Sequence, residues 1–141
     1  MRQIEEAYLK TGKVRFGYLH LIIKGKESQW AAEASECAGE QSEKLFWAYH
    51  DKLFAVATGE NPIPFNPENL KGFAAELGLD PQAFSECLDS GRYGPVVQAD
   101  TQTAWFLNFR ATPSFLINGK PLVGAQPFEV FSDYIESALN P

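Results

Sequence analysis

The chain has 141 residues, of which 45% are hydrophobic, 13% aromatic and 21% charged. This length and composition predict one domain with an apolar core and exclude a globally disordered chain. Its 12 basic and 18 acidic residues give a net charge of −6, so a phosphate-binding surface is excluded and no nucleic acid is expected as a partner. No apolar run approaches the roughly 20 residues that cross a bilayer, so no membrane span is expected.

An amphipathic helix is predicted at the start of the chain, over residues 1–10. Ile4 and Tyr8 share one of its faces, and Gly12 stands where a left-handed residue commonly closes a helix. The charges on this segment make it neither a signal peptide nor an anchor. Apolar residues then alternate from Val14 to Leu19, which predicts a strand.

Helical periodicity dominates residues 28–107. Ser, Asn and Asp residues stand where N-caps are needed, and two of them precede a proline, which suits the first position of a helix. The predicted helices follow Ser28, Ser42, Asn66 and Asp80, and a further helix is predicted over 95–107.

A hairpin and a final helix are predicted in the last thirty or so residues. Thr112-Pro113 breaks the helical pattern, because proline cannot continue a helix. Strands at Ser114–Ile117 and Pro121–Val123 then flank Asn118-Gly119, a dipeptide that tolerates positive φ at both central turn positions. An amphipathic helix opens at Pro127.

This order of elements resembles the DsbA-like thioredoxin-fold family. The resemblance implies an α/β, thioredoxin-like fold in a single domain spanning residues 1–141, with a helical insertion at about 27–108 and with the first strand missing. The stretches that agree with the family are YLKTGKVRF at 8–16, AAEASECAGEQ at 31–41, FWAYHDKLF at 46–54, ENLKGFAAELGLD at 68–80, CLDSGRY at 87–93 and ATPSFLINGKPLVGAQPFEVF at 111–131.

The resemblance also implies thiol-disulfide oxidoreductase chemistry that these residues do not carry. In the family, the nucleophilic cysteine sits at the N-terminus of the first helix, where the helix dipole stabilises a thiolate. The chain has no Cys-x-x-C motif, since its two cysteines, Cys37 and Cys87, are fifty positions apart. We therefore expect no catalytic residue within the chain and no dithiol exchange by it alone.

Two functional hypotheses follow from the resemblance. In the first, the native product forms or exchanges disulfides in exported proteins, with the chemistry encoded upstream of Met1. In the second, the chain is a redox-inactive module for peptide binding or assembly. Under both, Thr112 and Pro113 are the expected substrate-binding residues, because the family holds this proline cis and pairs neighbouring backbone groups with an extended peptide. An extracytoplasmic location, in the periplasm or cell envelope, and no cofactor are also implied.

The two cysteines allow two interpretations. Each follows a glutamate, which disfavours a thiolate, so neither Cys37 nor Cys87 is expected to act as a nucleophile. A structural disulfide that ties the helical insertion together agrees with the exported habit of the family. Two buried free thiols are the alternative.

The remaining polar and aromatic residues are interpreted mainly as packed or solvated side chains. His20 and His50 have no Glu or Cys at helical ligand spacing, so no metal site is expected. Trp105 and Phe106 are left open between packing and a peptide-facing groove. Four glutamates are expected on a solvated helix face: Glu33, Glu36, Glu40 and Glu43. Four aromatic residues are expected in the core: Phe46, Trp47, Tyr49 and Phe54.

The missing strand has a consequence for assembly. In the family it lies between the strand predicted at Val14–Leu19 and the one predicted at Ser114–Ile117. Unpaired strand edges recruit other strands. We therefore expect either direct pairing of these two strands or a homodimer that exchanges elements across the exposed edges.

Overall fold

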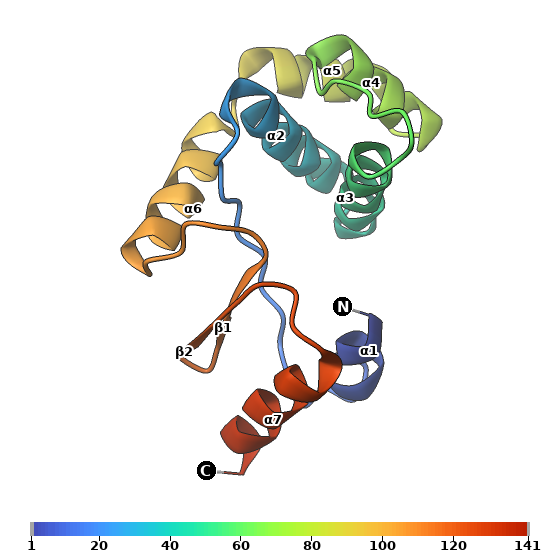
Figure 1. Cartoon of the computed structure of the whole chain (residues 1–141). Helices are drawn as coiled ribbons and strands as arrows, with labels where there is room; N and C mark the ends of the chain where they lie inside the picture. Colours follow the sequence, from blue (N-terminus) through green and yellow to red (C-terminus); the bar gives the residue numbers. More distant parts are fainter. Residues whose placement is uncertain (1, 141) are drawn as a thin grey trace. The chain divides into compact units, whose positions relative to one another are not determined.

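The computed structural model describes residues 2–140, with Arg2 described by its backbone only. The chain divides into two compact units. The helical unit comprises residues 22–103, and the hairpin unit comprises the residues up to 21 together with those from 104 onward. The expected insertion at about 27–108 overlaps the helical unit, and helix α6 runs from one unit into the other (Figure 1).

The helical unit is built around its first helix. The helices are α2 (Gly25–Gln41), α3 (Glu43–Ala57), α4 (Pro67–Glu76), α5 (Pro81–Ser90) and most of α6 (Gly94–Phe106). Helix α2 packs against α3, α4 and α5 (Figure 1). It begins three residues before Ser28, so the prediction that Ser28 caps it is wrong. Its N-cap residue, Lys24, makes no capping hydrogen bond from its side chain.

The other predicted N-caps are confirmed. Ser42, Asn66 and Asp80 each accept a hydrogen bond from the backbone N–H three residues further on, at 3.2, 2.9 and 2.8 Å. Each bond satisfies one of the N–H groups that the first turn of a helix leaves without an internal partner. Local sequence therefore determines where α3, α4 and α5 begin.

Aromatic and aliphatic side chains close the core of the helical unit. Tyr49, Leu70 and Phe84 are almost fully buried, and the rings of Tyr49 and Phe84 lie 5.4 Å apart. The Tyr49 hydroxyl donates a hydrogen bond of 2.8 Å to the Leu70 carbonyl. Burial raises the pKa of Tyr49 above its ordinary value. The neutral phenol is therefore a structural part of this core.

Two expectations about surface and core need correction. Glu33 was expected on a solvated face but is buried, and Gln29 Nε2 donates a hydrogen bond of 2.8 Å to its carboxylate. The Glu33 carboxylate lies against Gly94, at the start of α6. Phe54 was expected in the core, yet 57% of its surface is exposed, whereas Tyr49 on the same helix is buried.

The hairpin unit combines helical segments with a short sheet. It contains α1 (Arg2–Ile4), the π-helical turn η1 (Glu5–Leu9), β1 (Ser114–Ile117), β2 (Lys120–Val123) and α7 (Phe128–Leu139). Strands β1 and β2 are antiparallel, and the turn between them has positive φ at Asn118 and Gly119, as predicted.

A small apolar core joins the segments of this unit. The rings of Phe115 on β1 and Phe131 on α7 meet edge to face, with centroids 4.8 Å apart. Tyr8 and Ser132 share a hydroxyl–hydroxyl hydrogen bond of 2.7 Å. The buried members of this core are Ile4, Tyr8, Leu122, Phe131 and Ile135.

The predicted strand at Val14–Leu19 is not formed. Residues 14–23 have no helix or strand, and β1 and β2 pair with each other alone within residues 2–140. A strand exists only where its backbone groups find a partner, which alternation of apolar residues cannot supply. Direct pairing between Val14–Leu19 and β1 is accordingly not seen.

Within residues 2–140, none of the helices has the length and apolar character that crossing a bilayer requires.

Candidate peptide-binding site

The loop between α6 and β1 carries Thr112 and Pro113, and both are exposed. Their peptide bond is cis in the structure. Asn108, two residues beyond the end of α6, has a left-handed backbone conformation with φ of 64°. The Arg110 Nη1 atom then donates hydrogen bonds of 2.9 Å to the carbonyls of Trp105 and Phe109. These bonds hold the loop against the end of the helix.

Pro113 continues the hairpin beyond the two strands. Its carbonyl accepts a hydrogen bond of 2.8 Å from the Gly124 N–H, where φ is 88°. The Ser114 hydroxyl donates a bond of 2.6 Å to the Ala111 carbonyl on the other side of the proline. Hydrogen bonds thus hold the loop in place on both sides of Pro113, while the Pro113 ring stays exposed.

The register of the hairpin shows which backbone groups of β1 face away from β2. A two-residue turn places Ile117 opposite Lys120 in a hydrogen-bonded pair, and such pairs alternate along the ladder. Phe115 therefore bonds to β2, whereas Ser114 and Leu116 direct their N–H and C=O groups to the outer edge. We call these backbone groups of Ser114 and Leu116 the outer edge of β1.

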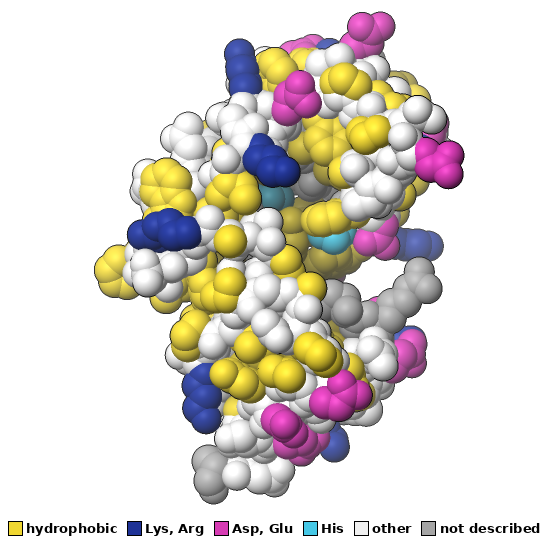
Figure 2. All heavy atoms as spheres, in the orientation of Figure 1, with side chains coloured by type: hydrophobic (Ala, Val, Ile, Leu, Met, Phe, Trp, Pro, Cys, Tyr) yellow, Lys and Arg dark blue, Asp and Glu magenta, His cyan; other side chains and the backbone are white. Residues whose placement is uncertain are grey.

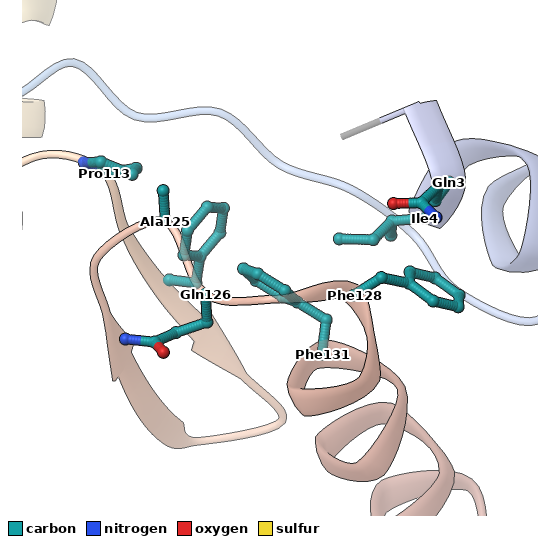
Figure 3. Close-up of a pocket in the computed structure, with 8 residues that line it drawn as sticks. Gln3, Ile4, Pro113, Ala125, Gln126, Phe128 and Phe131 are labelled. Atoms are coloured by element: carbon teal, nitrogen blue, oxygen red, sulfur yellow. The ribbon is translucent and has the colours of Figure 1, made fainter.

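A pocket of about 210 Å³ opens beside Pro113 (Figure 3). It lies within the hairpin unit, with α1 on one side, the hairpin on the other and the start of α7 below. Gln3 and Gln126 are its polar lining residues. The remaining walls come from Ile4, Pro113, Phe115, Ala125, Phe128 and Phe131. The proline is thus both part of the exposed loop and a wall of an apolar pocket.

Cys37 and Cys87 lie in the helical unit, outside this pocket. They form a disulfide that joins α2 to α5, with their Cα atoms 5.8 Å apart. Each cysteine is only 2% exposed, and no free cysteine exists among the described residues. Because they are buried and bonded to each other, neither cysteine can act as a nucleophile in this structure.

The remaining candidates are not brought into one site. His20 is buried, and His50 is half-buried with its Nδ1 atom 3.1 Å from Asp51 Oδ1. No group of three metal-ligating side chains occurs among residues 2–140. Trp105 and Phe106 precede the loop with 48% and 90% of their surfaces exposed, and they do not line the pocket.

Sequence reasoning missed the pocket itself. Helical and strand periodicity marks Ile4, Phe115, Phe128 and Phe131 as apolar positions that face inward, and this is true of them. Periodicity does not show whether inward-facing side chains meet one another or leave a space between them. Only the placement of α1 against the hairpin and α7 distinguishes a pocket wall from a closed core.

Comparison with known proteins places the chain in a family. A family model described as thioredoxin matches residues 1–137. Disulfide bond formation protein D of Bacillus subtilis is 26% identical over 139 residues, which cover 98% of this chain and 63% of that protein. The crystal structure of oxidised BdbD from Bacillus subtilis gives a TM-score of 0.87 at 25% identity and covers 99% of this chain and 76% of that chain.

The chain also resembles a segment of larger proteins. Na(+)/H(+) antiporter NhaA 1 of Salinispora arenicola is 34% identical over 138 residues, which cover 96% of this chain but 20% of that protein. The chain therefore spans less than two thirds of the length of the first curated relatives that it matches. The family match over nearly the whole chain and the fold that it shares with BdbD show that the chain belongs to the DsbA-like thioredoxin-fold family of thiol-disulfide oxidoreductases.

Proposed function

We propose that this chain supplies the peptide-holding part of a protein thiol-disulfide oxidoreductase that forms or exchanges disulfides in exported proteins. The observation that carries the proposal is the exposed Thr112-Pro113 loop, which hydrogen bonds from Arg110 and Gly124 hold in place. An extended peptide needs backbone partners of this kind. The name of the relative in Bacillus subtilis, a disulfide bond formation protein, supports the reaction class.

The chain by itself is proposed to be inactive in dithiol exchange. In that reaction a thiolate attacks one sulfur of a disulfide, a new S–S bond forms as the old one breaks, and the other sulfur leaves as a thiolate. The attacking thiolate must be exposed and stabilised. Cys37 and Cys87 are buried and bonded to each other, so neither offers one.

The alternative is a redox-inactive module that keeps the loop for peptide binding or assembly. The same two observations, an exposed loop and an inaccessible disulfide, favour it equally. The coding DNA upstream of Met1 distinguishes the two. An in-frame strand with Cys-x-x-C supports the oxidoreductase, and a stop codon without them supports the redox-inactive module.

Peptide binding and turnover are tested on the 141-residue chain. We expect no reduction of insulin above a buffer control, and binding of a labelled extended peptide detected by fluorescence anisotropy. Pro113→Ala should weaken this binding about tenfold, which corresponds to about 1.4 kcal/mol. Pro121→Ala is the matched control, since Pro121 is an exposed proline of the same hairpin that does not line the pocket.

Three results would contradict these proposals. Turnover that disappears when Cys37→Ala and Cys87→Ala are introduced together would show that the internal cysteines are active. Equal loss of binding in Pro113→Ala and Pro121→Ala would assign the effect to the hairpin as a whole. Absence of binding to any extended peptide would remove the peptide-holding function.

An extracytoplasmic location is proposed as well. Disulfides persist mainly in oxidising compartments, and this chain holds one between α2 and α5. Acid quenching of the producing cells, followed by alkylation and mass analysis, should find Cys37 and Cys87 unalkylated. Two alkylated cysteines in freshly quenched cells would contradict this location.

The homodimer expected from the sequence stays a prediction. The outer edge of β1 is the part of the described chain that a second copy would pair with. Light scattering at micromolar concentration measures the mass directly, and a monomer at all concentrations would contradict the prediction.

A further inference from the structure

We infer that the guanidinium group of Arg110 binds a carboxylate of the peptide, so that the Thr112-Pro113 loop selects acidic side chains. This inference rests on the peptide-holding function proposed above, and it adds the class of peptide residue that the loop prefers. It depends on the hydrogen-bond donors of one side chain, and neither the pocket nor the edge of β1 enters it.

The first observation is that the Arg110 side chain is held in one orientation. Its Nη1 atom donates to the carbonyls of Trp105 and Phe109, at 2.9 Å each. The Trp105 carbonyl also accepts the Asn108 N–H at 2.9 Å, so it belongs to the hydrogen-bonded end of α6. These bonds satisfy carbonyls that the last turn of a helix leaves without an internal partner. A side chain that is already ordered loses less conformational freedom when it binds a ligand.

The second observation concerns the donors that these bonds leave over. A guanidinium group has five N–H groups, and the structural role of Arg110 engages Nη1 alone. Within residues 2–140, Nε and Nη2 of this exposed side chain donate to no protein acceptor. The Nε–H and the adjacent Nη2–H are parallel and match the two oxygens of one carboxylate. A neutral amide has one oxygen and cannot form this pair.

The third observation is the charge of the surrounding sequence. Although the whole chain carries a net charge of −6, residues 101–128 contain no Asp or Glu, and their only charged side chains are Arg110 and Lys120. In the helical unit, by contrast, Arg92 has its Nη1 atom 2.8 Å from Glu40 Oε1. No such ion pair occupies Arg110 in the described part of the chain. A carboxylate from a bound peptide is therefore the charge that complements this loop.

The test measures the binding of short peptides to the 141-residue chain by fluorescence anisotropy at low ionic strength. The peptides have the sequence Thr-Val-Thr-Val-Thr, blocked ends and an uncharged fluorophore, with one residue replaced by Glu, Gln or Lys. The replacement is made at each position in turn, and the three residues are compared at the position where Glu binds most tightly. The net charge of the chain alone would favour the Lys peptide, so a preference for Glu reports a local cation.

Three variants identify the cation. Arg110→Gln removes the charge, and Arg110→Lys keeps the charge without the parallel donors. Lys120→Gln is the matched control, because Lys120 is the other cation of the same acid-free stretch and is also exposed. Binding of the uncharged Gln peptide reports in every variant whether the loop still holds a peptide.

We expect the unmodified chain and Lys120→Gln to bind the Glu peptide about fivefold more tightly than the Gln peptide, and the Lys peptide most weakly. Arg110→Gln should bind the Glu and Gln peptides equally, and Arg110→Lys should retain a preference of about twofold. Raising the salt concentration to about 0.5 M should reduce the preference of the unmodified chain for Glu, because the exposed charges are then screened.

Equal binding of the Glu and Gln peptides by the unmodified chain would overturn this inference and leave the peptide-holding function intact. A preference for Glu that Lys120→Gln loses would assign the selection to the wrong cation. If Arg110→Gln weakened the Glu and Gln peptides by the same factor, Arg110 would hold the loop without selecting the peptide. Binding of none of the peptides would overturn both this inference and the proposed function.

Discussion

The two units of this chain differ in how completely they bury their apolar residues. In the helical unit, Tyr49, Leu70 and Phe84 are almost fully enclosed, and a disulfide links two of the surrounding helices. The hairpin unit leaves Leu116 and Val123 about half exposed. Figure 2 shows hydrophobic side chains at the surface in several places on the face that it draws.

The difference has a physical origin in the backbone. A helix satisfies its hydrogen bonds internally, so a group of helices can close around its side chains without leaving an edge. A two-stranded sheet has two outer edges and two faces, and a short sheet cannot cover all of them. The helical unit is therefore expected to provide stability, and the hairpin unit to provide the binding surface.

The largest expected effect is the loss of a core ring from the helical unit. Phe84→Ala removes an almost fully buried phenyl ring and should lower the free energy of unfolding by about 3–5 kcal/mol. Phe106→Ala, at a side chain that is 90% exposed, should change it by no more than about 0.5 kcal/mol. Urea unfolding followed by circular dichroism measures both. If the two variants lost similar free energies of unfolding, the difference in burial between the two units would have no effect on stability.

The disulfide should come next. Replacing both cysteines through Cys37→Ala and Cys87→Ala opens a loop with a sequence separation of 50. We expect the free energy of unfolding to fall by about 2–4 kcal/mol, because the unfolded chain gains conformational freedom. Urea unfolding of the oxidised chain, the reduced chain and the double variant measures the effect. A reduced chain as stable as the oxidised one would show that the disulfide contributes nothing.

A smaller and pH-dependent effect is expected at Tyr49. Tyr49→Phe removes the hydroxyl that donates to the Leu70 carbonyl and should cost about 1–3 kcal/mol at neutral pH. The pKa of Tyr49 is raised on folding, so its contribution is fully present below the ordinary tyrosine pKa of about 10 and is lost as pH rises above it.

The measurement is the difference in unfolding free energy between Tyr49→Phe and the unmodified chain at pH 7 and above pH 10. The difference should narrow at the higher pH. A difference that stays constant or widens there would show that the phenol is not held neutral by burial.

The smallest expected effect is the loss of a single helix cap. Asp80→Ala removes the acceptor for the Ala83 N–H at the start of α5 and should cost about 1 kcal/mol. Asp80→Asn, which keeps an oxygen acceptor, should restore most of the loss. Thermal unfolding measures both, and equal losses in the two variants would show that the charge matters rather than the cap.

Much of the local structure follows from short sequence signals. Ser42, Asn66 and Asp80 begin their helices as predicted, and Asn118-Gly119 forms the turn of the hairpin. These features depend on side chains and backbone groups within a few residues of one another. Apart from the strand predicted at Val14–Leu19, the order of elements could therefore be inferred before any contact was known, and the resemblance of several stretches to a family indicated its α/β thioredoxin-like fold.

Features that depend on distant segments were decided by tertiary structure. The alternation at Val14–Leu19 forms no strand, because a strand needs a partner that no local pattern provides. Glu33 is buried where its carboxylate lies against Gly94, about sixty residues away in the sequence at the start of α6. The pocket exists because Ile4, Phe115 and Phe131, far apart in sequence, face one another across an unfilled space. Sequence alone determined the helices, the hairpin and the family, and packing between distant segments decided which strands form, which surfaces close and which stay open.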